Sequence, residues 1–145
     1  MLKVEYLINE KVSVEDFMYV LQGSGLAERR PVSDISTLQG MLDHANLTIS
    51  AKIDGVLIGI ARSVTDFHYA CYLSDLAVLK SFQKKGIGKK LIEETKAQLG
   101  PNCSIILLSA PKAGSYYPHI GFKQHDSAWT LAPDMPVCGS GSYFC

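Results

Sequence analysis

The sequence lacks any uninterrupted apolar segment of the roughly 20 residues that a transmembrane helix requires. It also lacks the features of a secretory signal peptide, because it begins Met1-Leu2-Lys3-Val4-Glu5. Neither sign of charge dominates, since 14 basic residues balance 14 acidic ones. We therefore expect neither a membrane nor a nucleic acid as a partner.

Cysteine and histidine are few, and they are not spaced as metal ligands. The four cysteines form no CxxC pair, and the four histidines show no zinc-ligand spacing. Cys71 and Cys103 lie in apolar, strand-like segments, where a thiol behaves as a small hydrophobic side chain. We expect no bound metal and a reducing, cytoplasmic compartment.

The length of 145 residues, with 47% hydrophobic and 19% charged residues, is ordinary for one globular domain. We see no internal repeat. Residues 132–145 contain two prolines and two glycines, which favour an irregular extension. The predicted organisation is therefore a domain over residues 1–131 followed by a C-terminal tail over residues 132–145.

Hydrophobic periodicity and turn residues predict both strands and helices in the first half, with most of the strands consecutive. Asp54-Gly55 is typical of a tight hairpin turn, and Ser13 is a candidate helix cap. The expected elements are a strand over Lys3–Ile8, a helix over Ser13–Leu21, an exposed connection over Leu26–Ser33, a helix over Ser36–His44, a hairpin of Leu47–Ile53 with Val56–Val64, and a strand over Tyr69–Val78.

In the second half, a helix should open at Gly86 and stop at Gly100-Pro101. The nearly continuous apolar segment Cys103–Ser109 suits a central strand covered on both faces. Ala113–Ile120 suggests a helical turn, Gly121-Phe122 the start of a strand that pairs with Trp129–Leu131, and Trp129 and Phe67 core positions. This order predicts an α+β fold with a mixed sheet.

The loop between the strand ending at Val78 and the next helix carries four lysines and two glycines within seven residues. A helix N-terminus already has partial positive charge, so an isolated helix would place Asp or Glu there. The lysines make sense if an anion such as a phosphate docks on the free N–H groups, with glycines allowing close approach. The alternative is a solvated helix start with Lys89–Glu93 and Lys90–Glu94 pairs.

Two common phosphate motifs do not fit this loop. A P-loop needs Ser or Thr after Gly-Lys, but Lys90 follows Gly88-Lys89. A dinucleotide-binding GxGxxG motif would need glycine at Leu91.

Leu76-Ala77-Val78, the loop Gln83–Gly88 and Leu91-Ile92 together resemble the acetyl-CoA motif of the GCN5-related N-acetyltransferase (GNAT) family. Downstream, Ala113, Tyr116-Tyr117 and Gly121-Phe122 match the pattern A-x-x-[FY]-Y-x-x-x-G-F of that family. The resemblance covers about residues 3–131. It implies a mostly antiparallel mixed sheet with splayed strands, flanked by about four helices.

The resemblance also implies how acetyl-CoA is bound. The strand main chain would hold the pantetheine arm, and the loop N–H groups would wrap the pyrophosphate with added lysine charge. The implied acetyl-CoA residues are Leu76, Ala77, Val78, Gln83, Lys84, Lys85, Gly86, Ile87, Gly88, Lys89 and Lys90. The N–H of Val78 would meet the developing oxyanion.

Tyr117 matches the catalytic tyrosine of the family, which acts as general acid toward the leaving CoA thiolate. Reference pKa values of about 10 for tyrosine and about 8.5 for a thiol are close enough for this transfer. The asparagine that many members carry before this helix is Ala110 here, so one contact of the family is missing.

Four residues are candidates for the acceptor side. Asp75 is the only carboxylate in its strand, and it is either a base or amine anchor, or a structural hydrogen-bond partner. Strict alternation puts Asp75 on the face opposite Leu76 and Tyr72, unless the strand is distorted. Arg29 and Arg30, with Tyr72, are candidate substrate contacts; a solvated loop or a structural ion pair is the alternative for the arginines.

The expected function is transfer of the acetyl group of acetyl-CoA to a primary amine by direct attack in a ternary complex. The alternative is an acyl-CoA-binding regulatory module without turnover. Neutral charge favours a small-molecule amine over a protein acceptor, and a homodimer is left open.

Overall fold

The computed structural model describes residues 3–138. Residues up to Leu108 form one compact unit, and a second unit begins at Ser109. The first unit contains β1 (Glu5–Ile8), α1 (Val14–Ser24), the 3₁₀ helix η1 (Leu26–Arg29), α2 (Ile35–His44), β2 (Leu47–Ile53), β3 (Val56–Thr65), β4 (Ala70–Val78), η2 (Lys80–Phe82), α3 (Ile87–Ala97) and β5 (Ser104–Ile106). The second contains η3 (Pro111–Ala113) and α4 (Tyr116–His119).

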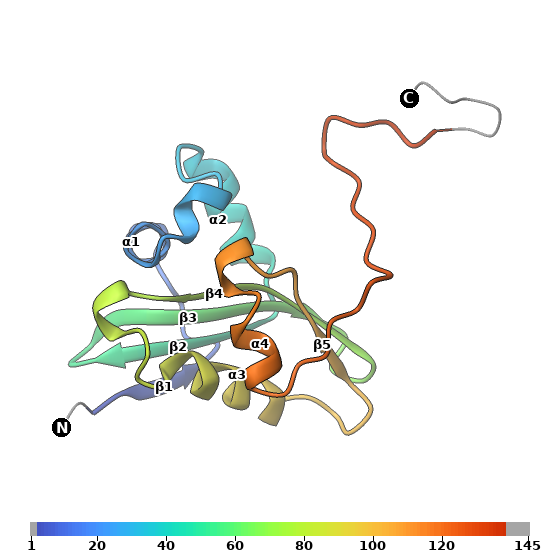
Figure 1. Cartoon of the computed structure of the whole chain (residues 1–145). Helices are drawn as coiled ribbons and strands as arrows, with labels where there is room; N and C mark the ends of the chain where they lie inside the picture. Colours follow the sequence, from blue (N-terminus) through green and yellow to red (C-terminus); the bar gives the residue numbers. More distant parts are fainter. Residues whose placement is uncertain (1–2, 139–145) are drawn as a thin grey trace. The chain divides into compact units, whose positions relative to one another are not determined.

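The strands form one five-stranded sheet in the order β1-β2-β3-β4-β5. The pairs from β1 to β4 are antiparallel, and β5 alone is parallel to β4 (Figure 1). The predicted α+β class with a mixed, mostly antiparallel sheet is therefore confirmed.

Helices cover both faces of this sheet, with α1 and α2 on one face and α3 on the other (Figure 1). Gly59 of β3 allows the approach of α3, because a Cβ there would lie 3.3 Å from Leu91 Cδ1. The core includes the fully buried Phe17, Leu38 and Ile60. Burial of each such side chain stabilises the fold by about 1.5–3 kcal/mol.

Local capping explains where the early elements begin and turn. Ser13 Oγ accepts from the N–H of Asp16 at 3.1 Å, which confirms the predicted cap of α1. That helix continues through Ser24, beyond the predicted end at Leu21, and Gly25 terminates it with φ +90°. Asp54 and Gly55 have φ values of 49° and 79°, so the predicted hairpin forms with a turn that favours the right-handed strand twist.

The prediction of a central, covered strand over Cys103–Ser109 is wrong. Only Ser104–Ile106 form a strand, and β5 is the edge of the sheet, with Ile106 52% exposed. A short apolar run does not by itself reveal how many neighbours a strand will have.

The strands expected after Gly121 are also absent from the part of the chain that the structure describes, where residues 120–138 contain turns and irregular segments. Trp129 is 93% exposed, so its predicted core position is wrong. Phe67 is half-buried in the β3–β4 turn. Residues 139–145 of the predicted tail lie outside the described residues, and the boundary at 131 stays a prediction.

Among residues 3–138, no helix is long and apolar enough to cross a membrane.

Candidate functional site

The exposed edge of β4 is the first feature of the candidate site. β5 pairs with β4 only at Ala70, Cys71 and Tyr72, and β4 then continues for six residues to Val78. Among the described residues, β4 is therefore paired on one side only from Leu73 onward, with β3. The predicted splaying of the strands occurs at this point.

The hydrogen-bonding direction along β4 follows from its alternation. The N–H of Leu79 donates to the carbonyl of Ile58 at 2.9 Å, so it points toward β3. In an antiparallel pair the direction reverses at each residue, so the main-chain groups of Leu76 and Val78 point away from β3. Two backbone N–H donors and two carbonyl acceptors thus face the open edge, and Gln83 Nε2 already donates to the carbonyl of Val78 at 2.8 Å.

The loop after β4 presents a run of unpaired N–H groups. Lys84 and Gly86 have positive φ values of 63° and 81°, and Gly86 is the N-cap of α3 without any side-chain cap. Within residues 3–138, the N–H groups of Lys84 through Lys89 donate to no hydrogen-bond acceptor. Consecutive N–H groups at a helix start, with lysines around them, form a site for an anion such as a pyrophosphate.

The lysines of this loop divide into two kinds. Lys89 and Lys90 pair with Glu93 and Glu94 one turn further along α3, at 3.7 and 3.3 Å. Lys84 and Lys85 are exposed and make no ion pair within residues 3–138. The positive charge of the loop therefore comes chiefly from Lys84, Lys85 and the helix terminus.

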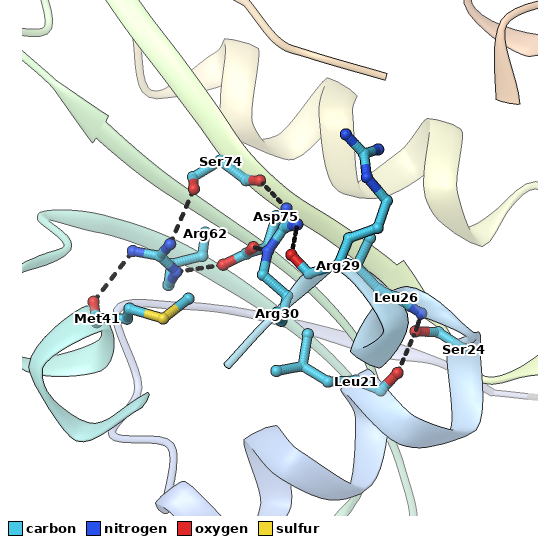
Figure 2. Close-up of polar contacts among 9 residues, drawn as sticks. All are labelled: Leu21, Ser24, Leu26, Arg29, Arg30, Met41, Arg62, Ser74 and Asp75. Carbon is cyan, nitrogen blue, oxygen red and sulfur yellow. Dashed lines mark hydrogen bonds and ion pairs between the residues drawn. The ribbon is translucent and has the colours of Figure 1, made fainter. Parts of the chain in front are cut away.

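Asp75 lies at the centre of a buried ion-pair cluster on the face covered by α1 and α2 (Figure 2). Its side chain is fully buried; Oδ1 accepts from Arg30 Nε at 2.5 Å, and Oδ2 accepts from Arg62 Nε. The sequence left open a substrate contact, a solvated loop or a structural ion pair for Arg30. The structure contains the ion pair, with Asp75. Arg29 is exposed and its side chain runs away from the cluster (Figure 2).

A β-bulge at Ser74 changes which side chains share a face of β4. Arg62 is opposite Asp75, but the next residue, Ser63, is opposite Leu73, so Ser74 is an extra residue. Tyr72 is opposite Val64, which alternation places on the same face as Arg62. Tyr72 and Asp75 therefore share a face, contrary to strict alternation.

Two members of this cluster, Arg62 and Ser74, were not among the sequence candidates. Arg62 Nη1 donates to the carbonyl of Met41 at 3.1 Å, and Nη2 donates to Ser74 Oγ at 2.9 Å. The available signal was an arginine directly after the apolar segment Leu57–Ala61, inside the same predicted strand, since a buried charge needs a partner.

Tyr117 lies in the second unit, in the helical turn α4. Its carbonyl accepts from the N–H of Phe122 at 2.9 Å, and the carbonyl of Pro118 accepts from Gly121 at 3.2 Å. Gly121 has φ +106°, and this set of bonds is a Schellman C-cap. Tyr116 contacts the ring of Tyr117 edge to face at 5.3 Å, and burial raises the pKa of Tyr116.

The sequence matches the family model of the acetyltransferase (GNAT) domain over residues 20–130. The chain belongs to the GNAT family. It is 26% identical over 117 residues to an uncharacterized N-acetyltransferase, ycf52, of Gracilaria tenuistipitata var. liui. That match covers 79% of this chain and 64% of the relative, so the chain spans less than two thirds of the length of that relative.

Solved structures share the fold. A GNAT-family acetyltransferase from Streptococcus pneumoniae TIGR4 superposes with a TM-score of 0.73 and 23% identity, over 90% of this chain and 97% of that one. The aminoglycoside N-acetyltransferase AAC(6')-Iy, solved in complex with CoA, gives a TM-score of 0.70 and 18% identity, over 93% and 97%. At these identities the likeness shows the GNAT fold alone.

Proposed function

We propose that this protein transfers the acetyl group of acetyl-CoA to the primary amine of a small molecule. The observation that carries the proposal is the run of unpaired N–H groups from Lys84 to Lys89, directly after the open edge of β4. The family match and the GNAT fold of the CoA-bound neighbour support the same donor.

The donor fits these residues in a defined order along the chain. The N–H groups of Lys84–Lys89 bind the pyrophosphate, with Gln83 holding the carbonyl of Val78 at the loop entrance. The main-chain groups of Leu76 and Val78 bind the pantetheine amides as an additional strand would. Ala77 lies between them with its side chain buried, and Ile87 anchors the first turn of α3 in the core.

Leu76 lies nearer than Val78 to the point where β5 separates from β4. With the phosphates at the loop, the thioester end of the donor lies toward that point. We therefore assign to the N–H of Leu76 the stabilisation of the negative charge that develops on the carbonyl oxygen. The sequence alone had suggested Val78 for this role.

Tyr117 acts as general acid in this proposal, donating the proton of its hydroxyl to the sulfur of the leaving CoA thiolate. The acceptor nitrogen attacks the carbonyl carbon, the bond to sulfur breaks, and the nitrogen loses its extra proton to water. Asp75 is a positioning residue rather than a base, because both its oxygens are engaged by guanidinium groups. Bound acetyl-CoA supplies the activated acyl group.

The test measures CoA release from acetyl-CoA across a panel of small amines between pH 6 and 9. Tyr117→Phe should lower kcat by about a hundredfold or more, the usual contribution of a general acid. Tyr116→Phe is the matched control, since it removes a neighbouring hydroxyl and keeps the ring contact. Unchanged kcat for Tyr117→Phe at every pH would exclude Tyr117 as the acid.

Binding of acetyl-CoA by calorimetry separates this proposal from a regulatory module. Tight binding without CoA release on any amine would favour a module that senses acyl-CoA. An absence of binding would remove the proposed donor altogether.

A further inference from the structure

Three exposed apolar side chains form a row across the sheet. Val64 on β3 is opposite Tyr72 on β4, and Tyr72 is opposite Ile106 on β5. Because directly paired residues share a face, the three side chains lie next to one another. They are 49%, 41% and 52% exposed, so an apolar strip crosses three strands where β4 and β5 separate.

The guanidinium of Arg30 lies at the margin of this row, and it does not use all of its N–H donors. Its Nη2 donates to the carbonyl of Ser74 at 2.7 Å, and Ser74 is two residues from Tyr72, roughly 7 Å along the strand. A guanidinium has five N–H donors, and Arg30 uses three of them, on Asp75, Arg29 and Ser74. Its side chain is 18% exposed.

The buried ion-pair cluster on this face has an excess of positive charge. Asp75 is the only carboxylate on β3, β4 and β5, and it is buried between Arg30 and Arg62. In the neighbouring turn η1, exposed Glu28 offsets exposed Arg29. Arg30 and Arg62 share this one carboxylate, so the cluster keeps one net positive charge beside the apolar row.

These observations constrain the ligand of this face. An apolar group covers the row, and an anionic group takes the two remaining N–H donors of Arg30 in a charge-assisted contact. Both groups fit within the length of one small molecule, given the roughly 7 Å between Ser74 and Tyr72.

We propose that the acetyl acceptor is an amino acid with an aromatic or branched aliphatic side chain, whose carboxylate contacts Arg30 and whose side chain covers Val64, Tyr72 and Ile106. The inference rests on the proposed acetyltransferase function, and it names the class of acceptor.

Pairs of amines that differ in one group test the proposal. L-phenylalanine and phenethylamine differ only in the carboxylate, and L-phenylalanine and L-alanine differ only in the ring. The full chain should show a kcat/KM for L-phenylalanine about tenfold or more above that for phenethylamine, as expected for one hydrogen bond to a charged group. Spermidine and kanamycin should be the poorest acceptors.

Two variants separate the two contacts. Arg30→Gln should abolish the preference for L-phenylalanine over phenethylamine, whereas Tyr72→Ser should reduce the preference for L-phenylalanine over L-alanine. Loss of the ion pair with Asp75 could destabilise Arg30→Gln. Tyr72 is exposed, so Tyr72→Ser should fold in either case. Thermal melting checks that both variants are folded.

A binding measurement makes the result independent of turnover. Saturation-transfer NMR on the chain with CoA should show contact of the L-phenylalanine ring, weakened by Tyr72→Ser and absent for spermidine. If acetyl-CoA binds and spermidine or kanamycin is acetylated better than L-phenylalanine, this inference is overturned and the proposed function stands. If acetyl-CoA does not bind, the proposed function fails, and the NMR contact alone decides whether the face binds amino acids.

Discussion

The backbone N–H of Phe122 donates to the carbonyl of Tyr117 at 2.9 Å, and the two rings meet edge to face with centroids 5.5 Å apart. In a Schellman motif, a hydrophobic contact of this kind commonly accompanies the bond that closes the helix. The family pattern Y-x-x-x-G-F therefore has a physical reading: glycine ends the turn and phenylalanine fixes the tyrosine. Gly121 is a positioning residue for Tyr117.

Gly121→Ala should lower kcat several-fold without changing the affinity for acetyl-CoA. A Cβ at φ +106° costs about 1–2 kcal/mol, which the short turn α4 relieves by opening its cap and releasing Tyr117. Calorimetry of acetyl-CoA binding beside steady-state kinetics gives the two quantities. Gly114→Ala is the matched control, because Gly114 has φ −61° and the nearest atom to a Cβ is 3.7 Å away. Equal effects of both variants would contradict the cap argument.

Gly86→Ala should raise the KM for acetyl-CoA roughly tenfold and leave the KM for the acceptor unchanged. A Cβ at Gly86 meets no atom within 4 Å, so the effect comes from φ +81° alone, at a cost of about 1–2 kcal/mol. Relief of this strain moves the N–H groups that we propose as the pyrophosphate site. Gly40→Ala, in the middle of α2 with equally open space, should instead stabilise the fold by about 0.5–1 kcal/mol. A normal KM in Gly86→Ala would place the phosphates elsewhere.

Local sequence rules predicted the first half of the fold well, since its signals lie within a few residues. Ser13 and Asp54-Gly55 act through bonds and φ angles of their own segment. The position of a strand in the sheet depends instead on segments far away in the sequence. Cys103–Ser109 has the composition of a buried strand, but only three of its residues pair, at the sheet edge.

In the candidate site, too, residues that are adjacent in the sequence could be predicted and residues that are far apart could not. The loop Gln83–Gly88 was readable because its lysines and glycines are adjacent in sequence. The cluster at Asp75 was not, because Arg30 is 45 residues away and Arg62 is 13 residues away. The bulge at Ser74 shifts the alternation of side chains along β4, so Tyr72 lies on the same face as Asp75. The residues next to Tyr72 in the sequence give no sign of this shift.

Asp75→Asn should destabilise the fold by about 3–5 kcal/mol, because it leaves two guanidinium groups without their carboxylate in a largely buried place. Chemical denaturation gives the free energy of unfolding. Glu94→Gln is the control at an ion pair with a more exposed lysine, where removal of the charge costs about 0.5 kcal/mol or less. Asp75→Asn with unchanged stability and abolished kcat would show instead that Asp75 acts as a base.

Alkylation should distinguish Cys71 from Cys103 in the folded protein. Burial raises the pKa of the Cys71 thiol, so at any pH near neutrality a smaller fraction of it is thiolate, the reactive form. Cys71 is also fully buried, whereas Cys103 is half-buried, with its Sγ 3.9 Å from Thr65 Oγ1. Iodoacetamide at pH 7.5, followed by peptide mass spectrometry, should modify Cys103 while Cys71 stays essentially unmodified. In denaturant, where both thiols are accessible, the two should react alike. Equal rates in the native protein would contradict this prediction, because they would show that Cys71 becomes accessible without global unfolding.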